Sequence, residues 1–468
     1  MIALRRSSQY SFGDGLITEE TSDLWEPWMR QADKVLGDEQ LVSVVYEALL
    51  KRHPQSRTRG RRGTPAEIVL RMLLLKHIRN WSFEEVAREV RANLVYREFT
   101  RIGAGKVPDD KTLGRQARAL GPEVIEKVHQ RMVALAVENK VVQGRKMRVD
   151  TTVVETNIHY PTDSSLLGDG NRVLTRLMKK VTAIAGAAGT KLRDRMKSVQ
   201  RRVAEIGRAA RTKGEKGKAK LQPLYTKMLG ITGRIVAQAK RFSAEITGGV
   251  KRSADGLKQA RLNELEREIE TMITRTQQVV SQTKARIFAG DTHVEGKLLS
   301  VFEPSTEIIR KGKASKPTEF GKMVKVQEAE NQIVIDFVVY DQRPSDNDLL
   351  IPSIEVHTEL MGRTPDLVAA DAGFFSAKNE AKAEEMGVKR VSVPNHSTKS
   401  AARRQYQKQR WFKKGQKWRT GCEGRISLLK RRHGLNRSRY KDDAGMKRWV
   451  GLGVIADNLI NIGRAMAK

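Results

Sequence analysis

The stretch Lys146-Met-Arg-Val-Asp-Thr-Thr-Val-Val-Glu155 decides the fold class of this 468-residue chain. Its β-branched and polar residues alternate at period two, which predicts a strand, and Asp150 lies inside that strand. A carboxylate within a sheet is costly unless it is hydrogen-bonded or bound to a metal ion. The same ten residues therefore indicate both a sheet and a candidate site.

Strand and helix patterns alternate in the last third of the chain. The segment Leu367-Val-Ala-Ala-Asp371 predicts a buried strand that ends in a carboxylate, and Ala372-Gly373 supplies the turn out of it. This order predicts an α/β core that is interrupted soon after its first strand. The other expected strands are 297–302, 322–328, 332–340 and 389–394, with helices near 346–361 and 376–386.

Helical patterns precede and interrupt that core. Residues 1–140 predict short helices with tight turns, which fit either a helix-turn-helix reader of DNA or a plain helical bundle. Residues 168–290 carry apolar residues at heptad spacing, which predicts an inserted α-helical hairpin or coiled-coil module. The core would then occupy 141–167 and 291–440, and residues 441–468 would form an apolar helix that packs on it.

Charge is the strongest signal in the composition. The chain has 88 Lys and Arg against 54 Asp and Glu, a net charge of +34, and residues 168–290 alone hold 28 basic and 10 acidic residues. Such an excess favours a polyanionic partner, nucleic acid ahead of an anionic membrane surface. A basic loop in the N-terminal region is a candidate phosphate contact, although a solvated loop would have the same composition: Arg57, Arg59, Arg61 and Arg62.

Several classes of protein are excluded by composition. No segment approaches the roughly 18–20 uninterrupted apolar residues of a membrane span, which argues against an integral membrane protein. The single cysteine, Cys422, allows no internal disulfide and no cysteine-based zinc site, and it fits a reducing cytoplasm. No Walker-type phosphate loop occurs, so ATP-driven chemistry is not expected.

Three carboxylates stand out by their context. Asp150 and Asp371 belong to predicted strands, and Glu423 is the only acid in residues 396–440, which hold 15 basic residues. Converging carboxylates need a divalent cation to stay ionised together, and hard oxygen ligands suit Mg²⁺ or Mn²⁺. Each residue also has a plainer interpretation, as a strand-end cap or a salt-bridge partner. Spacing does not exclude other acids: Asp291, Asp336, Asp346 and Asp348.

Four ordered segments resemble bacterial insertion-sequence DDE transposases. The first spans Asn93–Phe99 and Val107–Leu113, and the second is Arg148–Glu155 around Asp150. The third is Val368-Ala-Ala-Asp-Ala-Gly-Phe-Phe375, and the fourth runs from Arg419 through Glu423 to Lys430. In the last segment many members of the family place a tyrosine where this chain has Gln416.

The resemblance implies an RNase H-like core with a mixed sheet and a metal-binding triad of Asp150, Asp371 and Glu423. Two Mg²⁺ or Mn²⁺ ions per site would support hydrolysis at the transposon ends and attack of the freed 3′-hydroxyl on target DNA. The family also implies a homodimer on double-stranded DNA, here in the nucleoid-associated bacterial cytoplasm. The phosphate contacts it suggests on the third-carboxylate helix are Arg419, Arg425 and Lys430.

Two other functions remain open at this point. A non-catalytic repressor or architectural protein would need only the charge and the helices, and an RNase H-like nuclease would cut DNA without joining it. Trp411, Phe412 and Trp418 interleave with basic residues. This pattern suits either stacking on an unpaired base or anchoring of the basic segment 396–440 in a core.

Overall fold

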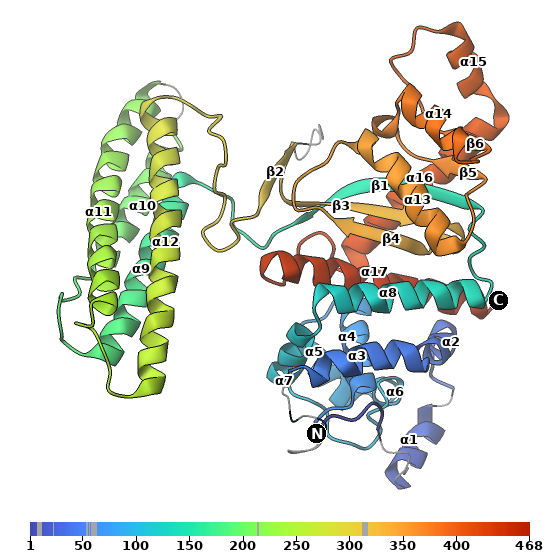
Figure 1. Ribbon diagram of the computed structural model, residues 1–468, viewed down its shortest axis with the longest axis horizontal. Helices are drawn as coiled ribbons and strands as arrows, with labels where there is room; N and C mark the ends of the chain where they lie inside the picture. The colour runs from blue at the N-terminus through green and yellow to red at the C-terminus, as the bar shows by residue number, and fades with distance from the viewer. Residues whose placement is uncertain are drawn as a thin grey trace. The chain divides into compact units, whose positions relative to one another are not determined.

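The computed structural model describes residues 1–6, 12–21, 23–52, 55, 57, 63–212, 215–310 and 317–468. This part of the chain divides into two compact units. Met1–Asn157 and Glu307–Lys468 form the first unit, and Ile158–Thr306 forms the second. The expected insertion, 168–290, lies within the second unit. Figure 1 shows the elements of both units.

The first unit contains the expected mixed sheet. Its strand order is β2-β3-β1-β5-β6, and β4 also pairs with β3. Strand β1 runs antiparallel to β3 and parallel to β5, so it lies centrally, as its sequence predicts. The strands are β1 (Lys146–Glu155), β2 (Glu307–Arg310), β3 (Thr318–Glu328), β4 (Val334–Val339), β5 (Leu367–Ala369) and β6 (Arg390–Ser392).

Helices cover both faces of this sheet (Figure 1). Successive side chains of a strand point to opposite faces, so β1 contributes to two separate cores. Met147 and Val149 pack with residues of α13 and α14, whereas Val154 packs with residues of α16 and α17. The helices of this region are α13 (Leu350–Met361), α14 (Ala377–Glu385), α15 (Ala401–Lys408), α16 (Arg410–Arg432) and α17 (Asp442–Met466), with short 3₁₀ turns η1 (Glu330–Gln332), η2 (Asp346–Leu349) and η3 (Ala372–Phe374).

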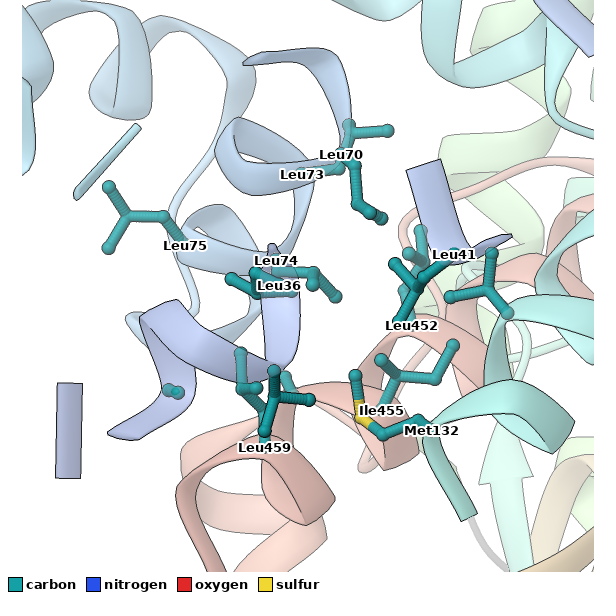
Figure 2. Packing of buried hydrophobic residues seen from close by; sticks show 14 of the residues in the cluster. Leu36, Leu41, Leu70, Leu73, Leu74, Leu75, Met132, Leu452, Ile455 and Leu459 are labelled. Atoms are coloured by element: carbon teal, nitrogen blue, oxygen red, sulfur yellow. The ribbon is translucent and has the colours of Figure 1, made fainter. Parts of the chain in front are cut away.

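The N-terminal helices share one hydrophobic core with α17. Leucines of α2, α3 and α4 meet Met132 of α8 and Leu452, Ile455 and Leu459 of α17 (Figure 2). Helix α17 also packs against β4, so it joins the helical region to the sheet. These helices are α1 (Phe12–Thr21), α2 (Pro27–Leu36), α3 (Glu39–Leu50), α4 (Ala66–Ile78), α5 (Phe83–Ala92), α6 (Leu94–Phe99), α7 (Asp110–Ala119) and α8 (Pro122–Glu138).

One expected strand is wrong. Residues 297–302 form no strand, and β2 begins only at Glu307. The Gln282 side chain of α12 takes the place of a neighbouring strand, because it accepts from Leu298 N and donates to Leu298 O, each at 3.0 Å. Leu298 and Val301 pack into the core of the helical unit, so their apolar pattern reflects that packing.

The second unit is helical, as expected. Helix α9 (Asp163–Ala185) packs against α10 (Met196–Ala209), α11 (Glu215–Thr247) and α12 (Gly256–Phe288). Leu262, Leu265 and Ile269, at heptad spacing, are buried in its core. Across both units, the described helices include none with the length and hydropathy needed to cross a membrane.

Candidate active site

Asp150 lies on β1, and Asp371 follows β5, the strand that runs parallel to β1. The β1–β5 register pairs Lys146 with Leu367 and Arg148 with Ala369, and it ends two residues before Asp150 and Asp371. Asp150 Oδ1 accepts from Thr151 N at 2.7 Å. Asp371 Oδ1 accepts from Gly373 N at 2.9 Å, which caps the turn η3. The fold therefore brings to the carboxyl end of β5 two carboxylates that lie more than 200 residues apart in the sequence.

A buried ionic network holds α16 against the central strands. Arg148 lies directly across from Glu328 of β3 and forms an ion pair with it, and it also donates to Trp418 O of α16. Arg425, further along α16, pairs with Asp457 of α17 at 2.9 Å. All four charged side chains are at most 5% exposed. Because buried charges are costly unless they are paired, this network fixes where α16 meets the sheet.

Gly421 allows the close approach of α16 to Arg148. A Cβ atom at this position would overlap the Arg148 guanidinium group. The same guanidinium lies 4.9 Å from the ring centroid of Trp418, a cation–π distance. Gly421 and Trp418 thus form the surface of α16 that contacts the Arg148 guanidinium group.

Arg419 connects Asp150 with Glu423. Its Nη1 lies 3.6 Å from Asp150 Oδ2, and its Nη2 donates to Glu423 Oε1. The Asp150 side chain is 13% exposed, whereas that of Glu423 is 54% exposed. The third carboxylate therefore lies at the rim of the site, with one guanidinium group between it and the first.

The carboxylate oxygens of Asp150 and Asp371 are suitable ligands for a divalent cation. Carboxylate oxygens are the ligands that Mg²⁺ and Mn²⁺ prefer, and Asp150 presents them on β1 and Asp371 just beyond the end of β5. Within the described residues, however, no three His, Cys, Asp or Glu side chains are gathered closely enough to hold a metal ion. Convergence of the full triad stays a prediction, since Glu423 is paired with Arg419 here.

Asp346, which the sequence leaves open as an alternative acid, lies next to Asp371. A Cβ atom built on Gly373 would be 3.2 Å from Asp371 Oδ1 and 3.3 Å from Asp346 Oδ2. Thr151 Oγ1 donates to Asp346 Oδ1 at 3.0 Å. In the sequence, this acid is marked only by the run Asp346-Asn347-Asp348 before helix α13. That run does not show which of its acids faces the site.

Gln416 occupies the position of the family's tyrosine and ties α16 to the ends of two strands. Its Nε2 donates to Ser392 O of β6 and, at 3.2 Å, to Ala370 O, the residue before Asp371. The sequence does not reveal this link, because it depends on the Gln416 side-chain amide reaching two backbone carbonyl groups. In this chain the side chain at that position contacts the protein backbone.

The expected DNA contacts have different environments. Arg425 is buried in its ion pair with Asp457, so in this conformation it has no surface to offer DNA. Lys430 is half-buried, and Arg57 is exposed and pairs with Glu47 at 3.0 Å. Arg59, Arg61 and Arg62 lie outside the described residues.

The aromatic residues of the basic segment 396–440 divide into two groups by burial. Phe412 is 2% exposed and anchors α16. Trp411 and Trp418 are half-buried and line a pocket of about 490 Å³ together with Lys146, Arg390 and Lys414. This pocket lies at the amino ends of β1, β5 and β6.

Two buried groups near Arg148, Glu328 and Cys422, have shifted pKa values. Burial raises the pKa of Glu328, an effect opposed by Arg148 beside it. Burial and the charge of Glu328 raise the pKa of the Cys422 thiol well above its usual range, which keeps it protonated. Cys422 therefore has the character of a core residue and not of a nucleophile.

The first unit thus combines a mixed sheet, one carboxylate on β1, another just after β5 and the basic helix α16 beside them. Two protein-family models match the chain: the Transposase DDE domain over residues 294–459 and the Transposase domain DUF772 over residues 28–118. The chain is a DDE transposase of the insertion-sequence type, and its activity is DNA transposition.

The two matches leave out the first carboxylate. The DDE match begins at residue 294, after Asp150 and within the last part of the second unit, which ends at Thr306. Comparison with curated proteins gave no significant match, and comparison with solved structures gave none. The placement of Asp150 near Asp371 is therefore inferred from the pairing of β1 with β5, which ends two residues before both acids.

Proposed function

We propose that this transposase hydrolyses a phosphodiester at each transposon end and then joins the freed 3′-hydroxyl to target DNA, with Asp150, Asp371 and Glu423 as its catalytic carboxylates. In the first step water attacks phosphorus and the 3′-oxygen leaves. In the second step that 3′-hydroxyl attacks a target phosphodiester and expels a target 3′-oxygen. The observation that supports the proposal is the parallel pairing of β1 with β5, which ends two residues before Asp150 and Asp371.

DDE transposases generally use divalent metal ions. We infer that Asp150, Asp371 and Glu423 would hold two Mg²⁺ or Mn²⁺ ions, which when bound activate the attacking hydroxyl and stabilise the leaving oxygen. Glu423 would have to exchange Arg419 for a cation, and its exposed position leaves room for that exchange. Arg419, once released, lies on the same face of α16 as Lys430 and would face the phosphates of the cut strand.

DNA is the substrate of this family, and two further properties belong to the proposal. Two copies of the chain would act together, each holding one transposon end. The protein would work in the nucleoid-associated cytoplasm of a bacterial cell. Trp411 and Trp418, in their basic pocket, would stack on a base that becomes unpaired near the cut.

Strand cleavage and strand transfer by single-residue variants test the proposal. Asp150→Asn, Asp371→Asn and Glu423→Gln each keep the size of the side chain and remove its charge. We expect each to lose on the order of 100- to 1,000-fold in cleavage of transposon-end DNA with Mg²⁺, while DNA binding is retained. Asp348→Asn is the matched control, because Asp348 is an exposed acid of the turn η2.

Each outcome separates one function from another. Full cleavage by any of the three variants removes that residue from the triad. Cleavage by the wild type without a joined product in a target plasmid would indicate a nuclease. Equal DNA binding by all variants and the wild type, with no cleavage by any of them, would indicate a protein that binds DNA without cutting it.

A further inference from the structure

A basic pocket of about 700 Å³ lies away from the carboxylates, between α5, α7 and the segment that joins α16 to α17. Every lining residue belongs to the first unit. None of them is among the phosphate contacts expected from the sequence. Six of the lining side chains are cations: Lys111, Arg115, Arg118, Arg439, Lys441 and Arg448.

Three of these cations form a single row. Lys111, Arg115 and Arg118 are spaced i, i+4 and i+7 along α7, so they share one face, and all three are exposed. Arg439 and Lys441, from the segment before α17, are exposed on the other side of the pocket. Side chains from two distant parts of the sequence thus concentrate positive charge around one cavity.

The five exposed cations differ from neighbouring basic residues in their partners. In the part of the chain that the structure describes, none of the five forms an ion pair with a carboxylate, whereas Arg131 of the adjacent helix α8 pairs with both Asp38 and Glu138. Asp442, also in the pocket wall, is used as a helix cap, since its Oδ1 accepts from Gly445 N at 2.6 Å. Asp110 is the other acid in the lining, so six cations face two carboxylates and the excess of positive charge favours an external anion.

The walls of the pocket are rigid. Arg448, the sixth cation, is 8% exposed and donates to Ala117 O of α7 at 3.0 Å, which holds α17 against α7. The rings of Phe83 and Tyr440 stack with their centroids 6.0 Å apart and their planes 2° apart. Lys76 Nζ lies 5.0 Å from the first ring centroid and 5.3 Å from the second. The charges are therefore displayed on a preorganised surface.

Gly114 lines the same wall, on the cationic face of α7. A Cβ atom here would lie 3.8 Å from Phe83 Cδ2, an ordinary contact, so the packing of the protein does not require glycine. Glycine inside a helix is less favourable than alanine. Its presence leaves the helix backbone open to the approach of a ligand between Lys111 and Arg118.

We propose that this pocket binds the phosphodiester backbone of duplex DNA, as a contact separate from the catalytic carboxylates. The inference rests on the proposed function in taking DNA as the substrate. Phosphates neutralised by the row on α7 and by Arg439 and Lys441 would release counterions, which makes this part of the binding strongly dependent on salt. A transposon end and a target duplex offer the same backbone chemistry.

Charge reversal at the pocket tests the proposal. Arg115→Glu and Arg118→Glu are compared with Lys127→Glu, which makes the same charge change at an exposed site on α8 outside the pocket. Binding is measured by fluorescence anisotropy from low to moderate salt, with a duplex carrying the element's own terminus and with an unrelated duplex of equal length. We expect about tenfold weaker binding for each pocket variant, with little change for Lys127→Glu. The salt slope should fall by roughly one for each phosphate that is no longer neutralised.

The outcomes distinguish this inference from the proposed function. Unchanged binding by both pocket variants, or an equal loss for Lys127→Glu, overturns the pocket proposal even if Asp150→Asn abolishes cleavage. Cleavage by Asp150→Asn overturns the proposed active site, whatever the pocket variants do. A loss seen with the terminal duplex alone assigns the pocket to the transposon end, and an equal loss with both duplexes indicates a contact to any DNA backbone.

A charge-preserving variant excludes an indirect effect. Arg115→Lys should keep the salt slope of the wild type, because a phosphate contact depends on the charge more than on the shape of the group. Thermal unfolding of every variant should match the wild type, since Arg115 and Arg118 are exposed. A lowered melting temperature together with weaker binding would assign the effect to folding and would contradict the proposal.

Discussion

Arginines of α16 and arginines of α7 belong to equally basic stretches of sequence but have opposite environments. On α16, Arg425 pairs with Asp457, and Arg419 lies between Asp150 and Glu423. On α7, Arg115 and Arg118 line an open pocket and have no carboxylate partner among the described residues. Whether a basic residue is held in an ion pair or left available to an external anion therefore depends on the acids that the fold brings to it.

The largest expected effect comes from breaking the buried ion pair. Asp457→Asn should lower the free energy of unfolding by about 3–5 kcal/mol, because it leaves the Arg425 guanidinium buried without its counter-charge. Arg118→Ala, at the exposed site, should change it by less than about 0.5 kcal/mol. Urea unfolding followed by circular dichroism measures both, and equal losses would remove the distinction between the two helices.

Two glycine-to-alanine changes sharpen the same comparison. Gly421→Ala should lower the free energy of unfolding by about 1–3 kcal/mol, because its Cβ overlaps Arg148. Gly114→Ala should raise it by up to about 1 kcal/mol, because alanine fits the helix there. Thermal unfolding distinguishes the two. A stabilised Gly421→Ala protein would show that α16 does not need its close contact with β1.

Lys76 represents a third environment, a cation buried among aromatic rings. Burial lowers the pKa of Lys76 to about 7, from an ordinary value of 10.5. Between these values the unfolded chain binds the proton and the folded chain does not, so the free energy of unfolding rises with pH. We expect a rise of about 1–2 kcal/mol from about pH 7 to about pH 8.5 that is absent in Lys76→Met. An identical pH dependence in both proteins would contradict this.

The smallest expected effect concerns Arg419. Arg419→Gln removes the guanidinium group that competes with a cation for Asp150 and Glu423. We expect Mn²⁺ to bind about tenfold more tightly, measured by titration calorimetry without DNA, while DNA cleavage falls because a phosphate contact is removed. Arg404→Gln, at an exposed arginine of α15, is the control. Weaker Mn²⁺ binding in Arg419→Gln would show that Arg419 supports the metal site.

Much of the fold was predictable because its signals are local. The alternation around Asp150 and the apolar strand before Asp371 each depend on a few adjacent residues. The strand expected at 297–302 failed for the converse reason. Its apolar residues are buried by helices of the second unit, and Gln282 satisfies the backbone of Leu298.

The sequence by itself determined the mixed core, the helical insertion, the transposase class and the three acids worth testing. Only the tertiary structure decided which charges meet, because an ion pair depends on side chains brought together from distant segments. Arg148 opposite Glu328, Arg419 beside Asp150 and the approach of Arg439 and Lys441 to the cations of α7 could not be inferred from spacing along the chain. The energy of a charge depends on its neighbours in space and on its exclusion from water.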